Sequence, residues 1–479
     1  MEIIHVSAEC YPVAKAGGLG DVVGALPKYL NKLGHTARVI MPMYKTKFLY
    51  ENEWLVDFKG HARLGNREFD YTIIKESTNK LGFDLYLVDI YGLLDREKIY
   101  GYDDDIERFM AFQIAVVDFL SHWSNKPDVI HCHDHHTGFI PFMMKHCYAY
   151  SYSLGSVKTV MTIHNAQYQG WLSWDKSYYL PSWDTWKHGL LDWGQTINSL
   201  ACGIRCADRV TTVSWSYLEE LRHSANGLEN LFEFERGKCV GILNGIDTEV
   251  WDPATDTYIE ENYSLKHLAK GKAKNKKLLC ETFNLDEDLP LIVFIGRLVG
   301  EKAADILPDV ILSSLYRTQK KVSFLLLGSG DPEVEWQLQR MASEFPGNYN
   351  AMIGYNEKLS HHMYAGADFL LMPSRVEPCG LNQMYAMRYG TVPMVRATGG
   401  LKDTVIDMGD DGGYGIRFFL ASVGDVLHAI LRAVEVYDDK DRLKKMRKTM
   451  MEIDNSWDNS AQQYVNVYAS LLVLSFIMV

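Results

Sequence analysis

The sequence of 479 residues lacks the features of a secreted, disulfide-bonded or membrane-spanning protein. Its eight cysteines are scattered, without the paired spacing of a metal site or a disulfide framework, which is typical of free thiols in a reducing compartment. The most apolar run, LLVLSFIMV at 471–479, is far shorter than the roughly 20 residues that cross a bilayer. We expect this run to form a buried terminal helix or strand, and we expect no membrane partner.

Positive charge is also scarce. Lys and Arg number 49 against 61 Asp and Glu, which gives a formal net charge of −12. Such a balance argues against a nucleic-acid partner and against binding to a membrane surface, and a small anionic ligand would need dedicated Lys and Arg residues. The opening residues, MEIIHVSAE, have no basic leader and enter a strand-like pattern at once. We therefore expect a cytoplasmic protein without a secretory signal.

The sequence does contain two series of short apolar strands that alternate with helix-length segments. In the first half, strands are predicted at 3–7, 37–42, 85–88, 128–131, 159–164 and 209–213. A turn-rich stretch, GILNGIDTEVWDP, follows at 241–253. The pattern then starts again, with strands predicted at 291–296, 323–328, 350–355, 368–374 and 391–398. Alternation of this kind predicts α/β domains in which helices cover a parallel sheet.

The chain is too long for one ordinary core, and the two series predict two doubly wound domains. We place them at 1–243 and 244–456, and expect residues 457–479 to return to the first domain and bury the apolar end. Folds of this kind bind ligands beyond the carboxyl ends of their strands, and two such domains usually bind a ligand between them. Residues of a functional site should therefore follow strands.

A glycine-rich turn, VAKAGGLGDVVG at 13–24, follows the first predicted strand. Such a turn can bring backbone N–H groups and the start of a helix close to a phosphate. The GxGxxG spacing of dinucleotide-binding proteins fails, because Gly18 and Gly20 are followed by Val23, and no P-loop Gly-Lys-Ser/Thr follows either. Lys15, two residues before Gly17, is placed to neutralise a phosphate. A merely structural turn is the alternative.

The second half repeats this arrangement after three of its strands. GRLVGEK at 296–302 carries Arg297 and Lys302, which could converge on a diphosphate. EPCGLNQMYAMRYG at 377–390 and RATGGLKDTV at 396–405 each open a predicted helix. Glu377, at the first of these helix starts, suits sugar hydroxyls better than a phosphate. A glutamate favoured there by the helix dipole alone is the alternative.

The run HCHDHHTG at 131–138 holds four histidines and one cysteine. Because successive side chains along a strand point to opposite faces, we expect these residues not to converge on a metal ion. A polar lining is the preferred interpretation, with Asp134 as a hydroxyl acceptor. The next predicted strand ends in TIHNAQYQGW, which puts His164 in the same relative place. The Trp- and Tyr-rich segment 170–194 suits sugar stacking and ordinary packing equally.

Together these motifs resemble the bacterial glycogen synthases and plant starch synthases, in the family's order and over nearly the whole chain. The matching pieces are AKAGGLGDV, HDHHTG, TIHNAQYQG, ADRVTTVS, GILNGIDTEVWDP, GRLVGEK, LGSGDPEVE, SRVEPCGLNQMYAMRYG and RATGGLKDTV. The resemblance implies the GT-B fold, two Rossmann-like domains facing across a deep cleft. It also implies transfer of glucose, with retention, from a nucleotide-diphosphate sugar, usually ADP-glucose, to the non-reducing 4-hydroxyl of an α-1,4-glucan such as glycogen or starch.

The resemblance further implies roles for individual residues. Those expected at the reacting sugar and the leaving diphosphate are Asp134, His164, Arg297, Lys302 and Glu377. Those expected to bind the nucleotide sugar are Lys15, Gly17, Gly18, Asp21, Asn244, Tyr355, Cys379, Gly380, Leu381, Thr398, Gly399 and Gly400. Within this set, Tyr355 would stack on the base, and the amides of 398–400 would contact phosphate. No metal is expected, because two fixed cations can stabilise the departing diphosphate. No pyridoxal phosphate is expected either, since that cofactor belongs to the glycogen phosphorylases.

The chain departs from the family's usual pattern at three positions, where Ala16, Glu301 and Ala303 replace Thr, Gln and Gly. Tyr385 stands where related retaining transferases carry a second glutamate, a feature shared by the starch and glycogen synthases. Three alternatives stay open. The first is a related transferase whose acceptor is a lipid, a small sugar or sucrose. The others are a glycogen phosphorylase and a non-catalytic glucan-binding protein. The choice between ADP-glucose and UDP-glucose, the acceptor chain length, allosteric control and the oligomeric state are likewise open at this point.

Overall fold

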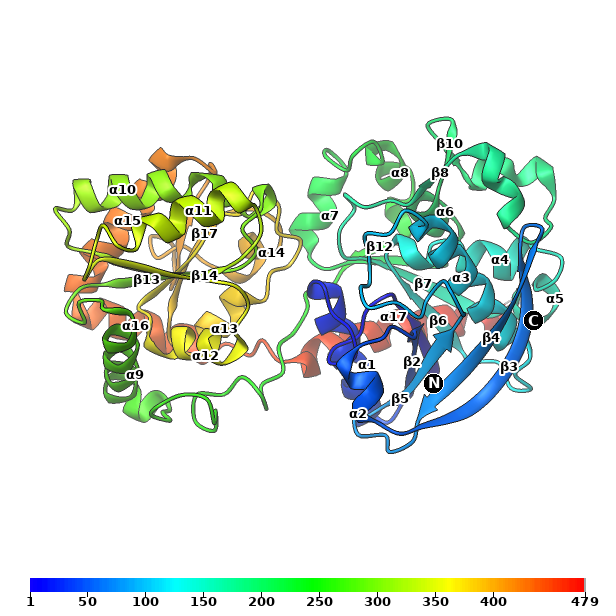
Figure 1. Ribbon diagram of the computed structural model, residues 1–479, viewed down its shortest axis with the longest axis horizontal. Helices are drawn as coiled ribbons and strands as arrows, with labels where there is room; N and C mark the ends of the chain where they lie inside the picture. The colour runs from blue at the N-terminus through cyan, green and yellow to red at the C-terminus, as the bar shows by residue number, and fades with distance from the viewer. Residues whose placement is uncertain (478–479) are drawn as a thin grey trace. The chain divides into compact units, whose positions relative to one another are not determined.

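The computed structural model describes residues 1–477, with side chains to residue 473, and the chain forms two compact units (Figure 1). The first unit comprises Met1–Asn244 and Trp457–Val479, and the second comprises Gly245–Ser456. The first boundary thus lies one residue after the expected one. Each unit contains its own sheet with a parallel core, so the predicted α/β fold with two sheet-based domains is confirmed.

The first unit is built on a nine-stranded sheet with the order β12-β11-β7-β6-β1-β2-β5-β4-β3. Its seven parallel strands are β1 (Glu2–Val6), β2 (Thr36–Pro42), β5 (Asp84–Asp89), β6 (Val129–His133), β7 (Lys158–Ile163), β11 (Arg209–Thr212) and β12 (Cys239–Gly241). Six of these seven correspond to the predicted strands, and the seventh, β12, adds one edge. A small antiparallel sheet joins β8 (Trp171–Leu172), β10 (Thr196–Asn198) and β9 (Asp192–Trp193).

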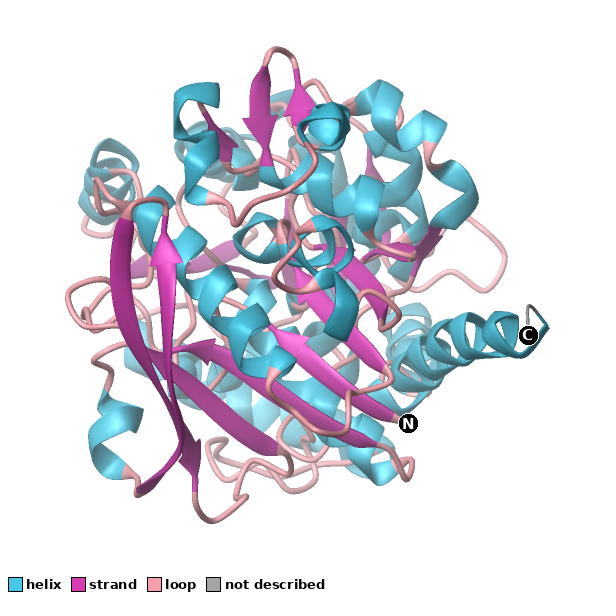
Figure 2. Ribbon diagram, turned by 90° about the vertical axis from the view of Figure 1, so that its right-hand side faces the viewer, coloured by secondary structure: helices cyan, strands magenta, loops and turns pink. Residues whose placement is uncertain are grey.

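The other edge of the large sheet is an antiparallel hairpin that the sequence did not predict. It pairs β3 (Trp54–Leu64) with β4 (Arg67–Glu76), and Figure 2 shows these two long strands as a twisted ribbon. Most of β3 is solvent-exposed, and only Ala62 and Leu64 are buried. An edge strand with so little buried surface has no strong apolar pattern, which explains why it was missed.

Helices cover both faces of this sheet. They are α1 (Gly18–Lys32), α2 (Lys47–Glu51), α3 (Asp105–Ser121), α4 (Ile140–His146), α5 (Ser151–Leu154), α6 (Ser199–Cys206), α7 (Trp215–Leu221), α8 (Glu229–Phe234) and α17 (Trp457–Ile477). Among the helices of the described chain, none is long and apolar enough to cross a membrane.

The carboxyl-terminal helix α17 completes the core of the first unit. Its Trp457, Tyr464 and Tyr468 are buried in one cluster with Leu26 and Leu30 of α1. Of the apolar run 471–479, Leu471 is buried and Val473 is 57% exposed, so the expected burial does not extend along the whole run. The side chains of 474–479, where the rest of that expectation falls, lie outside the described residues. Where the chain returns, the Ile246 N–H donates to the Asn455 carbonyl at 2.8 Å.

The second unit is a six-stranded, wholly parallel sheet with the order β15-β14-β13-β16-β17-β18. Its strands are β13 (Leu291–Ile295), β14 (Ser323–Gly328), β15 (Tyr349–Ile353), β16 (Phe369–Met372), β17 (Val392–Arg396) and β18 (Ile416–Phe418). Its helices are α9 (Leu268–Phe283), α10 (Leu307–Arg317), α11 (Pro332–Met341), α12 (Glu357–Gly366), α13 (Asn382–Arg388), α14 (Gly399–Thr404), α15 (Val423–Asp438) and α16 (Lys440–Met451). Five of the six strands were predicted, and β18, with three residues, was not.

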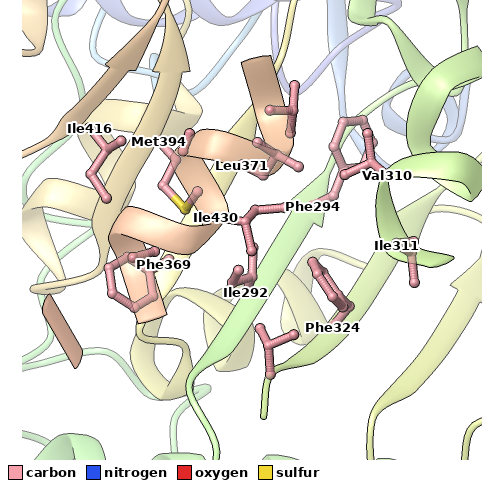
Figure 3. Close-up of a cluster of buried hydrophobic side chains, with 14 of the residues drawn as sticks. Ile292, Phe294, Val310, Ile311, Phe324, Phe369, Leu371, Met394, Ile416 and Ile430 are labelled. Atoms are coloured by element: carbon pink, nitrogen blue, oxygen red, sulfur yellow. The ribbon is translucent and has the colours of Figure 1, made fainter. Parts of the chain in front are cut away.

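Alternation along the strands divides the interior of this unit into two cores. Ile292 and Phe294 of β13 face one hydrophobic cluster, together with Phe369 of β16, as Figure 3 shows. Leu291 and Val293 face the other cluster. Strands buried on both faces read as continuous apolar runs, which is why they were visible in the sequence. The buried sheet fixes the loops that follow its strands, and the candidate site residues lie on those loops.

Candidate active site

In the first unit, the glycine-rich turn is organised by a carboxylate that sequence reasoning missed. Oε1 of Glu9, just after β1, accepts from the N–H groups of Ala16 at 2.6 Å and Gly17 at 3.0 Å. Oε2 of the same side chain accepts from the Tyr100 hydroxyl at 2.6 Å. Two N–H groups of the turn are therefore already engaged within the chain. A phosphate would have to displace Glu9 from them or use other donors.

Gly17 and Gly18 are glycines that the fold itself does not require. A Cβ atom added to either would meet nothing within 4 Å. Gly20 and Gly24 differ, because a Cβ there would lie 3.1 Å from Lys15 and 2.5 Å from the Tyr11 carbonyl. Packing therefore explains the later glycines of the motif but not the first two. Open space at Gly17 and Gly18 suits a turn that receives a ligand.

The two charged residues of this turn pair with each other. Lys15 Nζ lies 2.8 Å from the carboxylate of Asp21, and both side chains keep partial exposure. Both were expected to bind the nucleotide sugar, and the structure brings them together next to Gly17 and Gly18. An exposed ion pair of this kind is weak, so Lys15 can exchange Asp21 for an anionic ligand with little loss of free energy.

Asp134 has a backbone conformation that is nearly confined to glycine. Its φ is 60° and its ψ is −176°, just where β6 ends and the 3-10 turn η1 (His135–Thr137) begins. Holding a non-glycine residue there costs roughly 1–3 kcal/mol, and such strain is concentrated at functional sites. The Asp134 carboxylate accepts from the His164 backbone N–H at 2.7 Å, which joins the two residues expected at the reacting sugar.

The environment of Asp134 makes a pH-dependent contribution to stability. Burial raises the pKa of its carboxyl from 3.8 to about 7, although backbone N–H groups of His164 and Asn165 act in the opposite direction. A carboxyl group whose pKa is raised by folding stabilises the fold fully at pH values below its pKa in the unfolded state. This contribution is lost as the pH rises through its pKa in the folded state. We expect the free energy of unfolding, relative to that of Asp134→Asn, to fall from pH 5 to pH 8 by at most roughly 3 kcal/mol. Urea denaturation at the two pH values measures it, and a pH-independent difference would contradict the raised pKa.

Two histidines of HCHDHHTG lie on one face of β6. His131 and His133 are two residues apart on β6 and so share a face, where their rings stack with centroids 4.3 Å apart. With His5 of β1 they place three nitrogens within 4.8 Å of one another. Alternation therefore does not keep this pair apart, and the expectation that the whole run does not converge on a metal ion stays a prediction. Alternation separates them only from Cys132 between them.

Hydrogen bonds already occupy most nitrogens of this cluster. His131 contacts the hydroxyls of Tyr468 and Thr162 at 2.6 and 2.5 Å. His133 contacts His5 and His164, each at 3.0 Å. A metal ion bound here would displace several of these bonds. The absence of a metal from the reaction stays a prediction.

In the second unit, the loops after two neighbouring strands bring Lys302 and Glu377 together. Strands β13 and β16 pair directly, and the Arg375 N–H, on the loop after β16, donates to the Glu301 carbonyl at 2.8 Å. Glu377 Oε2 accepts from Lys302 Nζ at 2.5 Å and from the Ser374 hydroxyl at 2.8 Å. Only 8% of the Glu377 side chain is exposed, against 22% for Lys302. The structure thus supplies a buried carboxylate held by a cation.

Arg297, on the same loop as Lys302, is far more accessible. Its side chain is 54% exposed, and its ion pair with Glu301 is long, at 3.6 Å. Its guanidinium is therefore available to an anion, in contrast to Lys302. Further along, Ala303 adopts a left-handed conformation with φ of 55°, at a position where the family usually has glycine. The departure noted in the sequence thus falls where backbone geometry favours glycine.

The segment 377–380 packs directly onto the start of α14. A Cβ at Gly399 would lie 2.0 Å from the Glu377 carbonyl, and one at Gly400 would lie 2.1 Å from the Cys379 carbonyl. Close approach of two backbones therefore explains both glycines. The Thr398 N–H donates to Arg396, and the Gly400 N–H donates to Glu377 and Pro378. As in the first unit, expected phosphate donors are engaged within the chain, and their contact with phosphate stays a prediction.

The remaining expected site residues fall into two groups. Cys379 is buried and Gly380 has a φ of 77°, so both shape the loop that leads to Leu381. Helix α13 begins after this loop at Asn382, five residues after Glu377. Tyr355 follows β15 and is 81% exposed, and its stacking on a base stays a prediction.

Asn244 ends the first unit and is buried, and its Oδ1 has no hydrogen-bond partner among the described residues. Tyr385 stacks on Trp251 with centroids 3.9 Å apart, so it packs where related transferases carry a glutamate.

Comparisons with known proteins identify the family. The starch synthase catalytic domain model matches residues 2–234, and the glycosyl transferases group 1 model matches residues 276–449. The chain is 54% identical over 468 residues to a glycogen synthase of Flavobacterium johnsoniae, with 98% of each chain covered. It is 38% identical over 481 residues to a glycogen synthase of Bacillus cereus, covering 98% of this chain and 100% of the relative.

Solved structures support the same family assignment. The catalytic domain of starch synthase IV from Arabidopsis thaliana, bound to ADP and acarbose, has a TM-score of 0.88 at 33% identity, covering 98% of this chain and 99% of that one. Sucrose-phosphate synthase from Thermosynechococcus elongatus shares the fold alone, with a TM-score of 0.63 at 17% identity. The resemblance seen in the motifs is thus confirmed, and the chain belongs to the glycogen and starch synthase family, glycosyltransferases of the GT-B fold that synthesise glucans.

Proposed function

We propose that the protein transfers glucose from ADP-glucose to the non-reducing 4-hydroxyl of an α-1,4-glucan, with retention of configuration. The observation that carries the proposal is the pairing of Lys302 with Glu377 next to the exposed Arg297. Two cations and a buried carboxylate after adjacent strands suit a ligand that joins a diphosphate to a sugar. The ADP bound to the similar starch synthase IV domain supports adenosine as the base.

In this proposal Lys302 and Arg297 stabilise the negative charge that develops on the departing diphosphate. Lys302 would exchange Glu377 for phosphate, and Glu377 would then accept a hydrogen bond from a glucose hydroxyl. A carboxylate that accepts hydrogen bonds from both Ser374 and a glucose hydroxyl is a poor nucleophile, because both bonds stabilise its charge. This favours a same-face path through an oxocarbenium-like state, in which the departing diphosphate takes the proton of the acceptor hydroxyl.

In the first unit, Asp134 and His164 are assigned to the reacting sugar. The strained backbone of Asp134 and its bond to the His164 amide support a role beyond packing. Lys15 and the open Gly17-Gly18 turn are assigned to phosphate. A cytoplasmic location and the absence of pyridoxal phosphate belong to the same proposal.

The direct test is incubation with glycogen and either ADP-glucose or UDP-glucose, with nucleotide release as the readout. We expect glycogen-dependent release of ADP and much slower release of UDP. Parallel reactions with a lipid acceptor, a small sugar and sucrose test the alternative acceptors. Faster release from UDP-glucose would contradict the donor assignment, and binding of glycogen without any release would favour a non-catalytic protein.

Gly18→Ala tests the phosphate assignment of the turn. Because a Cβ at Gly18 meets nothing within the chain, we expect unchanged folding and a fall in kcat/KM for ADP-glucose of roughly 10- to 100-fold, the effect of a methyl group pressed against a ligand. Gly237→Ala is the matched control, since its Cβ also meets open space. Equal kcat/KM values in the two variants would show that no phosphate approaches Gly18.

Removal of metal ions is expected to leave the activity unchanged. Arg297 and Lys302 supply the positive charge that a divalent ion supplies in other phosphate-transferring sites. The nitrogens of His131 and His133 are taken up by hydrogen bonds. The measurement is ADP release before and after dialysis against EDTA. A loss of activity that zinc or magnesium restores would contradict this prediction.

A further inference from the structure

Three buried imidazoles form a chain that the proposed function does not yet use. His5, His133 and His164 lie on or just after β1, β6 and β7, which are neighbours in the sheet. His5 Nδ1 lies 3.0 Å from His133 Nε2, and His133 Nδ1 lies 3.0 Å from His164 Nε2. His5 and His133 are fully buried, whereas His164 is 8% exposed. The chain therefore runs from the interior to the one member assigned to the sugar.

Burial keeps all three rings neutral at physiological pH. It lowers the pKa of His5 and of His164 to about 3, and that of His133 well below the ordinary value. Three neutral rings carry three protons on six nitrogens, and each of the two contacts needs one proton. Only two arrangements satisfy this condition. Either all three rings are protonated at Nδ1, or all three are protonated at Nε2.

The far end of the chain selects between these arrangements. His5 Nε2 is buried and has no hydrogen-bond partner among the described residues. Protonation at Nε2 throughout would bury an N–H donor with nothing to receive it, and such orphaned donors are rare in proteins. Protonation at Nδ1 throughout leaves only an unshared lone pair at that position. Protonation of all three rings at Nδ1 is therefore favoured.

We propose that His133 and His5 are positioning residues that hold His164 as its Nδ1–H tautomer. His164 then offers an N–H donor to a ligand, since its Nε2 is taken by His133. Asp134, bonded to the His164 backbone, offers an acceptor beside it. Asp134 can therefore accept a hydrogen bond from one sugar hydroxyl, and His164 can donate a hydrogen bond to another. The role in sugar binding rests on the proposed function, but the tautomer does not.

His131 provides a matched control for this proposal. It lies on the same strand and the same face as His133 and is equally buried. Its nitrogens contact Tyr468 and Thr162, so it is outside the chain of three. Replacing either histidine with leucine removes two buried hydrogen bonds. Of these two changes, only the one at His133 removes the hydrogen bond to His164 Nε2.

The first measurement is the tautomer itself. In protein labelled with 15N-histidine, two-bond 1H–15N correlation spectra distinguish the two neutral forms, and a His164→Gln spectrum assigns the signal. We expect Nδ1–H at His164 in the unaltered protein and in His131→Leu. We expect a shift toward Nε2–H in His133→Asp, because an ionised carboxylate at this position can only accept a hydrogen bond from His164 Nε2. Nε2–H at His164 in the unaltered protein would overturn the proposal.

The second measurement separates positioning from simple loss of stability. His133→Leu should lower kcat by roughly tenfold relative to His131→Leu, with little change in KM, as expected when the partner of a functional histidine is lost. His133→Asn, whose amide can donate from the Nδ1 position, should restore most of the rate. Equal kcat values in the two leucine variants would overturn the positioning role. An unaltered protein with the Nδ1–H form but no glucose transfer would instead refute the proposed function alone.

Discussion

Arg297→Ala should lower kcat for glucose transfer by roughly 10² to 10³, the usual effect of losing one preorganised charge contact at a site where charge develops. Stability should change little. The side chain is 54% exposed, and its ion pair with Glu301 spans 3.6 Å, so the fold gains well under about 1 kcal/mol from it. A large kinetic effect without a thermal effect would mark Arg297 as a residue that acts on the ligand.

Arg340→Ala is the matched control for this variant. Arg340 pairs with Glu344 at the same 3.6 Å and the same spacing of four residues, on helix α11 of the same unit. Both variants should melt within about 2 °C of the unaltered protein, as expected for exposed pairs in a chain of this size. Arg340→Ala should retain full kcat. An unchanged kcat in Arg297→Ala would remove that residue from the proposed diphosphate site.

Lys302→Ala should produce a second large effect, on both activity and stability. We expect kcat to fall by roughly 10² to 10³ through loss of the second cation. The free energy of unfolding should also fall by roughly 2 kcal/mol, because Glu377 is 8% exposed and would keep only Ser374 as a hydrogen-bond partner.

The double variant Lys302→Ala/Glu377→Gln separates these two effects. Removing the buried charge should restore most of the lost stability, as measured by urea denaturation, but none of the lost kcat. Recovery of activity in the double variant would show that Lys302 acts only by pairing with Glu377. Full kcat in Lys302→Ala itself would exclude the lysine from catalysis.

The sequence predicted the fold wherever strands are buried on both faces. Strands such as β13 and β14 read as continuous apolar runs because helices cover both sides of the sheet. The β3–β4 hairpin was missed because most of β3 is exposed. The three-residue β18 was missed because its length leaves too little pattern to recognise. Alternation along β6 separates His131 and His133 from Cys132 but not from each other, and their clustering with His5 depends on the pairing of β6 with β1.

Contacts between candidate site residues were much harder to foresee. Glu377 and Lys302 are 75 residues apart in the chain, and His5 and His133 are 128 apart. Their motifs could be placed after strands, but only the strand order decides which loops become neighbours. Glu9 carried one usable signal, an acidic residue at the end of the first strand beside a glycine-rich turn. The hydrogen bonds that it accepts from the Ala16 and Gly17 N–H groups could be seen only in the folded turn.

The return of the chain through α17 has a consequence for biosynthesis. The core of the first unit needs Trp457, Tyr464 and Tyr468, yet residues 245–456 are synthesised before them. At about 5–20 residues per second, the first unit waits roughly 10 to 40 seconds for its last helix. During that interval the second unit acquires its full sequence, while the face of α1 that α17 will cover stays bare. The unit begun first is thus finished last, because its core closes only when α17 packs onto α1.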